Sequence, residues 1–260
     1  MKIWEITDEI ERFAPLSLQE SYDNCGYMCG SRENEINGIL LAIDITEAVV
    51  DEAINLGCNL IISHHPLIFR GIKSLSTDNY INRTLIKAIR NNITIYAAHT
   101  NMDSTQNGVS KVMADKLNLI NTRPLVTPQP GADYGLGIIG ELATETKTVI
   151  FLQFVKETFN CKVVKHSAIC KETVKQVALC GGAGAEFIEK AIGESADIYI
   201  TGDIKHHDWY RAENRVIIAD IGHYESEQYT KQLFYNIVSK KITNFAVRYS
   251  KADSNPVYVL

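Results

Sequence analysis

The chain has 260 residues, a net charge of −5 and a hydrophobic content of 45%, values typical of a globular protein with enough chain for one large domain or two modest ones. This charge argues against a nucleic-acid-binding surface, and no stretch approaches the roughly 18 apolar residues of a membrane span. Residues 1–13 lack the continuous apolar core of a signal peptide, and the six cysteines contain no C-x-x-C pair. We therefore expect a cytoplasmic protein with reduced thiols and no membrane contact.

The first part of the chain alternates predicted helices and strands. Apolar residues at helical spacing predict a helix from Ile3 to Phe13, which Pro15 ends. Thr46 is suited to capping a second helix, and Gly57 to ending it. The strands expected here are 39–43, 60–63 and 93–98, and the further helices are 80–91 and 109–117. This alternation is typical of parallel strands covered by helices.

A proline-rich stretch at 121–131 is the best candidate for a domain boundary or linker. Beyond it, we expect strands at 135–142, 162–165, 174–179, 198–201, 216–219 and 244–249. We expect one helix at 146–159, a second that begins at the glycine-rich turn 181–184 and ends at 192, and a third from about 223 to 240. The predicted fold class is α/β, with two related halves whose mainly parallel sheets are covered by helices. We place the halves at 1–125 and 126–260, with the last helix and strand as candidates to pack back on the first half.

The two halves resemble each other when they are aligned by eye. Residues 41–44 and 57–63 align with 179–182 and 195–201 without a gap, and 93–99 aligns with 217–223. In each half a strand ends at a histidine that a carboxylate follows four residues later: His99 and Asp103, then His223 and Glu227. An internal duplication would bring strand exits of both halves to one cleft, the usual location of a functional site.

Histidines cluster at the predicted strand exits. Of the seven in the chain only His166 lies elsewhere; the others are His64, His65, His99, His206, His207 and His223. Open α/β sheets bind ligands at the carboxyl ends of their strands, and imidazole is the commonest protein metal ligand. Neighbouring strand residues point to opposite faces, so His64 and His65 suit two ions better than one. Imidazoles with two carboxylates and no thiolate suit zinc, manganese or iron.

The proposed ligands also have structural explanations that need no metal. His64 and His65 could be turn residues before a proline, and Asp103 could cap a helix. His223 and Glu227 stand four residues apart, which is also expected of a solvated helix start. Their number and common location at strand ends favour the ligand interpretation, in which two ions share a water molecule that becomes a nucleophile.

Other polar residues at the strand exits have less certain roles. His99 is a candidate for contacting substrate or supporting a ligand. His206 and His207 are either polar cap residues or acid/base groups at the rim of a cleft. The turn 181–184 could seat a phosphate at a helix N-terminus, but it is not a complete G-x-G-x-x-G, so a tight strand-to-helix turn explains it better.

Five ordered motifs carry a family resemblance. They are Ser21-Tyr22-Asp23-Asn24-Cys25-Gly26, Ser63-His64-His65-Pro66, Ala98-His99-Thr100-Asn101-Met102-Asp103, Thr201-Gly202-Asp203-Ile204-Lys205-His206 and Gly222-His223-Tyr224-Glu225-Ser226-Glu227. With them, the chain resembles the NGG-interacting-factor-like family, often labelled GTP cyclohydrolase I type 2 homologs. The resemblance implies a site for two metal ions, in which His65 and Asp103 serve one, His64 and His223 the other, and Glu227 bridges both. It also implies a ring-shaped homohexamer built from dimers.

The resemblance and the residues together predict a binuclear metal-dependent hydrolase, a GTP cyclohydrolase 1 type 2 homolog. Metal-activated water would attack a nucleotide or a phosphoester-like small molecule, with His99 and His206 as catalytic candidates. The alternatives are a non-catalytic metal-binding or regulatory scaffold and a metal-free nucleotide-binding module. Longer relatives carry a domain between the halves, where this chain has only 121–131, and Tyr22 stands where many relatives have tryptophan.

Overall fold

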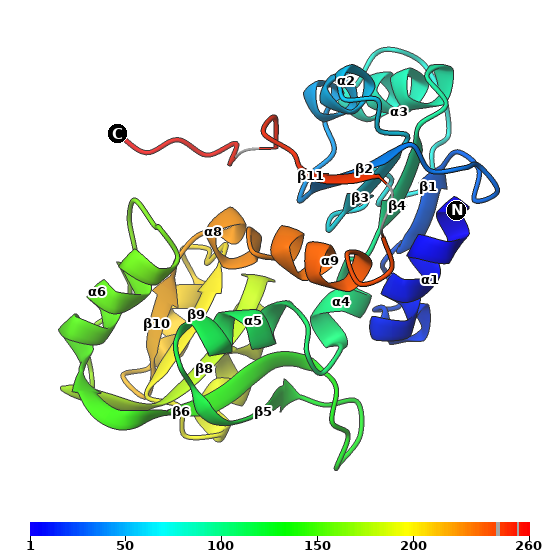
Figure 1. Cartoon of the computed structure of the whole chain (residues 1–260). Helices are drawn as coiled ribbons and strands as arrows, with labels where there is room; N and C mark the ends of the chain where they lie inside the picture. Colours follow the sequence, from blue (N-terminus) through cyan, green and yellow to red (C-terminus); the bar gives the residue numbers. More distant parts are fainter. Residues whose placement is uncertain (243–244, 254) are drawn as a thin grey trace. The chain divides into compact units, whose positions relative to one another are not determined.

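The chain forms two compact units, each with its own sheet (Figure 1) and its own buried hydrophobic residues. The computed structural model describes residues 1–242, 245–253 and 255–260. Unit 1 comprises Met1–Thr105 and the described part of Thr230–Ser254, and unit 2 comprises Gln106–Tyr229 and Asn255–Leu260. The predicted α/β class, with two sheets covered by helices, is confirmed.

Unit 1 is built on a five-stranded sheet with the strand order β1-β4-β3-β2-β11. Its strands are β1 (Gly26–Cys29), β2 (Gly38–Ala42), β3 (Leu60–Ser63), β4 (Thr94–Ala97) and β11 (Ala246–Tyr249). Strand β1 is antiparallel to β4, and the other pairings are parallel. All residues of β2, β3 and β4 are buried, as expected for parallel strands covered on both faces.

Helices cover both faces of the unit 1 sheet (Figure 1). They are α1 (Ile3–Phe13), η1 (Leu16–Leu18), α2 (Glu47–Asn55), α3 (Tyr80–Arg90), α4 (Thr100–Ser104) and α9 (Thr230–Val238). Helices α2 and α3 contact each other on one face, and α1 contacts α9 on the other. The helix starts follow from their caps: the Thr46 side chain accepts a hydrogen bond from the Val49 amide, and Asn79 accepts one from Asn82.

Unit 2 has a six-stranded mixed sheet with the order β5-β6-β8-β9-β10-β7. Its strands are β5 (Ile120–Val126), β6 (Leu136–Lys147), β7 (Lys165–His166), β8 (Thr173–Ala183), β9 (Ile198–Gly202) and β10 (Ile217–Asp220). Strands β8, β9 and β10 are parallel, whereas β5, β6 and β7 join by antiparallel pairing. The expectation of a mainly parallel sheet therefore holds for unit 1 but not for unit 2, where long hairpin strands extend the parallel centre.

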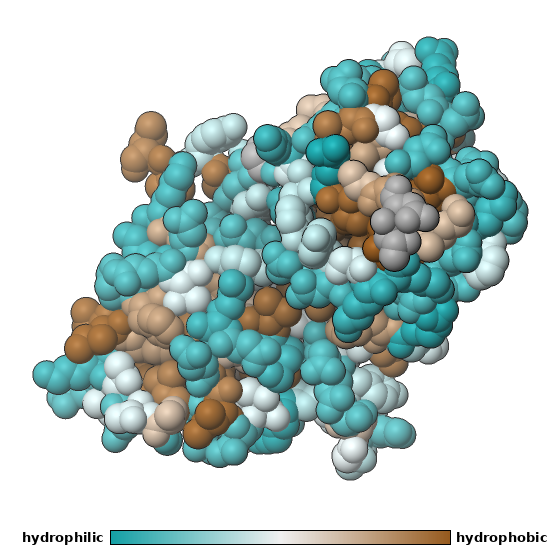
Figure 2. Space-filling view, in the orientation of Figure 1, coloured by the Kyte–Doolittle hydropathy of each residue, from teal (hydrophilic) through white to brown (hydrophobic). Residues whose placement is uncertain are grey.

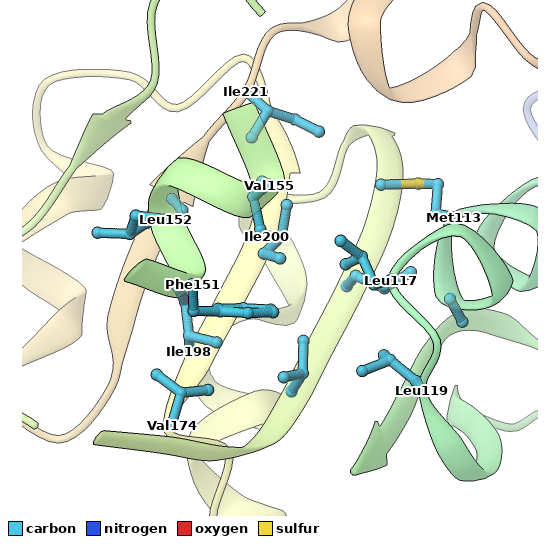
Figure 3. Packing of buried hydrophobic residues seen from close by; sticks show 14 of the residues in the cluster. Met113, Leu117, Leu119, Phe151, Leu152, Val155, Val174, Ile198, Ile200 and Ile221 are labelled. Carbon is cyan, nitrogen blue, oxygen red and sulfur yellow. The ribbon is translucent and has the colours of Figure 1, made fainter. Parts of the chain in front are cut away.

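Alternate residues of the unit 2 strands supply two separate cores. The helical elements are α5 (Val109–Lys116), α6 (Thr148–Thr158), η2 (Ala185–Phe187), α7 (Ile188–Gly193), η3 (Asp208–Ala212) and α8 (His223–Glu227). Ile198 and Ile200 of β9 belong to the core on the side of α5 and α6, and Figure 3 shows Val155 of α6 and Leu117, directly after α5, around Ile200. Tyr199, between them, belongs to the core on the α7 side. This alternation is the two-residue period of a strand buried on both faces.

The predicted linker is wrong over residues 121–126, because this segment is strand β5. Pro124 stands opposite Ile138 of β6, and β5 has β6 as its one neighbour in the sheet order. An edge strand tolerates proline because the missing amide would face away from the sheet. Pro124 thus marks an edge strand rather than a linker.

The two compact units of the structure divide the chain at other positions than residue 125. The chain passes from unit 1 to unit 2 at Thr105 and returns at Thr230. The reason is packing: α5 contacts β6 and β8 of the second sheet, whereas β11 pairs with β2 and α9 contacts α1 in unit 1. The division into functional halves at 1–125 and 126–260 stays a prediction.

Several predicted elements differ in their bounds. The helix expected from 223 to 240 is divided into α8 and α9, and β8 continues through the glycine-rich turn to Ala183. The strand expected at 162–165 is the short β7. Asn244, the expected start of the last strand, lies outside the described residues.

Nowhere in the described part of the chain does a helix combine the length and apolarity needed to cross a lipid bilayer. Hydrophilic residues cover most of the face shown in Figure 2, and hydrophobic residues gather in separate patches. One such patch lies over α6, where Val149 and Ile150 are more than half exposed.

Candidate metal centre

The histidine pair of unit 1 follows β3 directly. The amides of His64 and His65 continue the strand pairing by donating to the carbonyls of Ala42 and Ile43. His64 is fully buried, and its Nδ1 lies 3.0 Å from the carbonyl oxygen of Ala98. Because a carbonyl oxygen only accepts, Nδ1 carries a proton, and in the neutral ring Nε2 carries the lone pair.

Two further histidines of unit 1 are oriented by carboxylates. The Nδ1 of His65 lies 2.9 Å from Oδ1 of Asp44, and the Nδ1 of His99 lies 2.9 Å from Oδ1 of Asp23. Such a carboxylate fixes the ring orientation and keeps the proton on Nδ1. Metal-binding histidines are commonly held in this way, since it makes Nε2 the donor atom.

The exit of β3 and the exit of β4 bring these rings together. One ligand atom from each of His64, His65 and His99 lies within 4.8 Å of the others. Asp103, on α4, places Oδ1 3.6 Å from Nε2 of His64. Two ligands held about 2.1 Å from one tetrahedral ion are about 3.4 Å apart. The distance of 3.6 Å between Nε2 of His64 and Oδ1 of Asp103 is therefore close to the distance expected for two ligands of one ion.

A network of hydrogen bonds fixes the His99 side of this cluster. The buried Asp23 carboxylate accepts hydrogen bonds from the amide and hydroxyl of Thr100, and Cys25 Sγ lies 3.1 Å from its Oδ2. Burial disfavours ionisation of Asp23, but its hydrogen bonds with His99 and Thr100 outweigh burial and hold its pKa well below the ordinary range. The carboxylate is thus ionised and suited to stabilise a proton on His99.

Unit 2 offers a second histidine and carboxylate, at the start of α8. His223 follows β10, and its Nδ1 lies 2.8 Å from Oδ2 of Asp203. Its Nε2 lies 3.1 Å from Oε2 of Glu227, one helical turn further on. Glu227 is only 3% exposed. The pattern of unit 1 recurs here, with Nδ1 held by a carboxylate and Nε2 directed to an acidic oxygen.

The glycine-rich turn serves the Glu227 carboxylate rather than a phosphate. Gly182 has a φ of +63°, and a Cβ at this position would overlap Oε1 of Glu227. The amide of Gly182 donates to Ser226 Oγ, and that of Gly184 donates to Thr201 Oγ1. These amides are therefore engaged within the protein, which supports the turn interpretation over a phosphate site.

His206 and His207 lie apart from this pattern. Both are exposed, and their rings contact each other and Tyr210. In the described portion of the chain, no hydrogen bond or ring contact joins His206 to His223 or Glu227. The catalytic assignment of His206 remains a prediction.

The similarity of the chain to known proteins extends over nearly its whole length. The family model of Duf34/NIF3 (NGG1p interacting factor 3) matches residues 1–256. The chain belongs to the Duf34/NIF3 family. This confirms the resemblance carried by the five motifs. A relative, the GTP cyclohydrolase 1 type 2 homolog of Clostridium perfringens, is 36% identical over 230 residues, with 87% of each chain covered.

Solved structures agree with this membership of the Duf34/NIF3 family. The fold is similar to that of a Bacillus cereus protein related to NIF3, with a TM-score of 0.91 and 26% identity, over 100% of this chain and 99% of that chain. It is also similar to a hypothetical protein of Staphylococcus aureus, with a TM-score of 0.90, 29% identity and the same coverage.

The sequence analysis missed the acidic residues that orient the histidines. They are Asp23, Asp44 and Asp203, which bind Nδ1 of His99, His65 and His223. A signal was present, because Asp44 follows β2 and Asp203 follows β9, both at the carboxyl ends of parallel strands. Treating carboxylates at strand exits as supports of histidines would have found these two.

Proposed function

We propose that this member of the Duf34/NIF3 family is a divalent-metal-dependent hydrolase with two ions. His65 and Asp103 would bind one ion, His64 and His223 the other, and Glu227 would bridge them. One observation carries the proposal. In His64, His65 and His223 alike, Nδ1 lies within hydrogen-bond distance of an oxygen that can accept its proton. Nε2 is then the donor atom in each ring.

The donor set fits zinc, manganese or iron, because it combines imidazole nitrogens with carboxylate oxygens and contains no thiolate. When bound, such ions act as Lewis acids and lower the pKa of water to near neutrality. The protein's own contribution is to fix the donors, since Asp44 and Asp203 hold the rings and Gly182 leaves room for the Glu227 carboxylate.

His99 and His206 are the candidates for moving protons. His99 Nδ1 is held by the ionised Asp23, which would stabilise an imidazolium formed when Nε2 accepts a proton. His206 is exposed and would act at the surface. The substrate class we propose is a nucleotide or a phosphoester-like molecule, and the assembly we propose is a homohexamer, both from the family resemblance.

A second function is a non-catalytic metal-binding or regulatory scaffold that acts through protein contacts. The family description, NGG1p interacting factor 3, favours it because it records a protein interaction. The two functions differ in whether the bound ions keep a position for exchangeable water.

Turnover by stripped and reloaded protein tests the first function. The protein would be treated with chelator, reloaded with Zn²⁺, Mn²⁺ or Fe²⁺, and assayed against nucleotides and phosphoesters by product detection. His65→Ala should abolish metal-dependent turnover. His166→Ala is the matched control, because His166 is exposed and its Nδ1 lies 2.8 Å from the Ser167 carbonyl oxygen, outside the cluster. Stoichiometric metal without turnover of any substrate would favour the scaffold.

A further inference from the structure

Unit 1 contains a cavity of about 550 Å³ formed by the loop after the histidine pair and the start of α3. This volume is within the range of small-molecule sites, about 300–1,000 Å³. Its lining includes the apolar Ile68, Phe69, Ile72 and Ile81 and the cations Arg70 and Lys73. An apolar wall with a few charged groups is the usual composition of a ligand site.

The charges of the cavity favour an anion. Within the described ranges, neither Arg70 nor Lys73 takes part in an ion pair. The cavity also contains the carboxylate of Asp78, which accepts a hydrogen bond of 2.6 Å from Ser76 Oγ. Two cations against one carboxylate leave an excess of positive charge, which a phosphate group of a ligand would neutralise.

Beside the cavity, two aromatic rings are exposed. The ring centroid of Phe69 lies 6.3 Å from that of Tyr22 and 6.2 Å from that of His99. Phe69 is 43% exposed and Tyr22 is 59% exposed. Exposed aromatic faces of this kind bind planar rings by stacking. Phe69 therefore joins the cavity on one side to the histidine cluster on the other.

The backbone around the aromatic pair is held by hydrogen bonds. The side chain of Asn24 donates to the Ile68 carbonyl over 2.6 Å, which ties the loop of Tyr22 to the loop of Phe69. The neighbouring Asp23 is bound to His99 and Thr100. The rings thus stand on fixed backbone, which reduces the entropy lost when a ligand binds.

We propose that this part of unit 1 binds a nucleoside phosphate, with its base on Phe69 and Tyr22 and its phosphates at Arg70 and Lys73. In this binding mode the base, not the phosphate, would lie nearest His99 and the proposed metal ligands. One consequence of this rests on the proposed function. Hydrolysis would then be directed to the heteroaromatic ring rather than to a phosphoester. Binding itself requires no metal, because none of these four side chains is a proposed ligand.

Calorimetric titration of the metal-stripped full-length protein, in the presence of chelator, tests the binding mode without depending on catalysis. Three probes are used: GTP carries the base and the phosphates, guanosine carries the base without phosphates, and tripolyphosphate carries the phosphates without a base. The variants are Arg70→Gln/Lys73→Gln and Phe69→Leu. The controls are Arg90→Gln/Lys162→Gln, which removes two exposed cations elsewhere, and Tyr258→Leu, which removes an aromatic ring that is 85% exposed.

We expect each variant to weaken the binding of some probes and not of others. Arg70→Gln/Lys73→Gln should weaken GTP and tripolyphosphate by about tenfold or more and leave guanosine unchanged. Phe69→Leu should weaken GTP and guanosine by about fivefold or more and leave tripolyphosphate unchanged. Absence of GTP binding, or equal affinities for the variants and their controls, would overturn the proposal. Loss of turnover with GTP binding intact would instead count against the hydrolase function.

Discussion

Replacement of Gly182 by alanine should damage the proposed metal centre without replacing any of its proposed ligands. Gly182 has a φ of +63°, and an added Cβ would overlap Oε1 of Glu227 and lie 3.3 Å from Cε1 of His223. The positive φ costs about 1–2 kcal/mol for an L-residue. To reach an ordinary contact distance of about 3.5 Å, the carboxylate must move by about 1 Å. Metal–ligand distances hold to about 0.2 Å, so this shift removes Glu227 as a ligand.

Two control variants, Gly57→Ala and Gly193→Ala, separate the cost of a positive φ from the cost of the overlap between the added Cβ and Glu227. Gly57 has a φ of +68° with nothing within 4 Å of its Cβ position, and Gly193 has open space without a positive φ. Gly57→Ala should lower the free energy of unfolding by about 1 kcal/mol and leave metal binding unchanged. Gly182→Ala should lose about 1–3 kcal/mol and bind metal at least about tenfold more weakly.

Metal titration with a competing chelator, together with urea unfolding of the metal-free proteins, measures both quantities. The informative comparison is between Gly182→Ala and Gly57→Ala, since they share the backbone conformation. If the two variants bind metal equally well, the overlap with Glu227 has no effect on the site. Glu227 would then not be a ligand.

Three further predictions concern orientation, pH and thiol chemistry. Asp44→Asn should weaken metal binding by about 10–100-fold, because it removes the carboxylate on His65 Nδ1, and unchanged affinity in a chelator competition would refute this role. Partial burial opposes ionisation of Glu52, but its hydrogen bonds with Ser250 and the two following amides outweigh burial and lower its pKa. Glu52 therefore stabilises the fold above its ordinary pKa, and this contribution is lost as the pH falls through the lowered value. Urea unfolding should show Glu52→Gln less stable than wild type at pH 7, with the difference closing below about pH 4; a constant difference would contradict the assignment. Burial raises the pKa of the Cys161 thiol to about 12. Iodoacetamide at pH 8 should therefore label the partly exposed Cys170 well before Cys161, as measured by peptide mass spectrometry. The reverse order of labelling would refute the burial of Cys161.

The parallel strands could be predicted from sequence because they are continuous apolar runs. Strands β3, β4, β9 and β10 were each located to within a residue or two of the bounds in the structure. Burial on both faces requires such runs, and each ends at a polar residue where the chain leaves the sheet. The polar residues at the exits of β3 and β4, His64 and His99, could be found by the same reasoning.

The antiparallel parts of unit 2 were harder to predict, because their pairing depends on distant residues. Strand β5 contains Pro124, and its place at the edge of the sheet cannot be read from the local sequence. Similarly, β8 continues through Gly182, whose positive φ is explained by the approach of Glu227 from another element. Local patterns describe a segment's own preferences, whereas the conformation of Gly182 depends on residues more than 40 positions away in the chain.

The acidic residues that orient the histidines illustrate the same limit. Asp23 lies in a loop that looks irregular in sequence, and only the fold brings it to His99, 76 residues later. The tautomer of each histidine depends on such contacts. The sequence could therefore name candidate ligands, but not the nitrogen that each would use.

Metal content per chain is the most direct test of the proposed centre. The protein would be purified without chelator and analysed by elemental mass spectrometry, beside His65→Ala and the control His166→Ala. We expect two ions per chain in the wild type and in His166→Ala, and a clear loss in His65→Ala. If the wild type binds no metal even after reloading with Zn²⁺, Mn²⁺ and Fe²⁺, the histidines at these strand exits do not form a metal centre, and the hydrolase proposal is wrong.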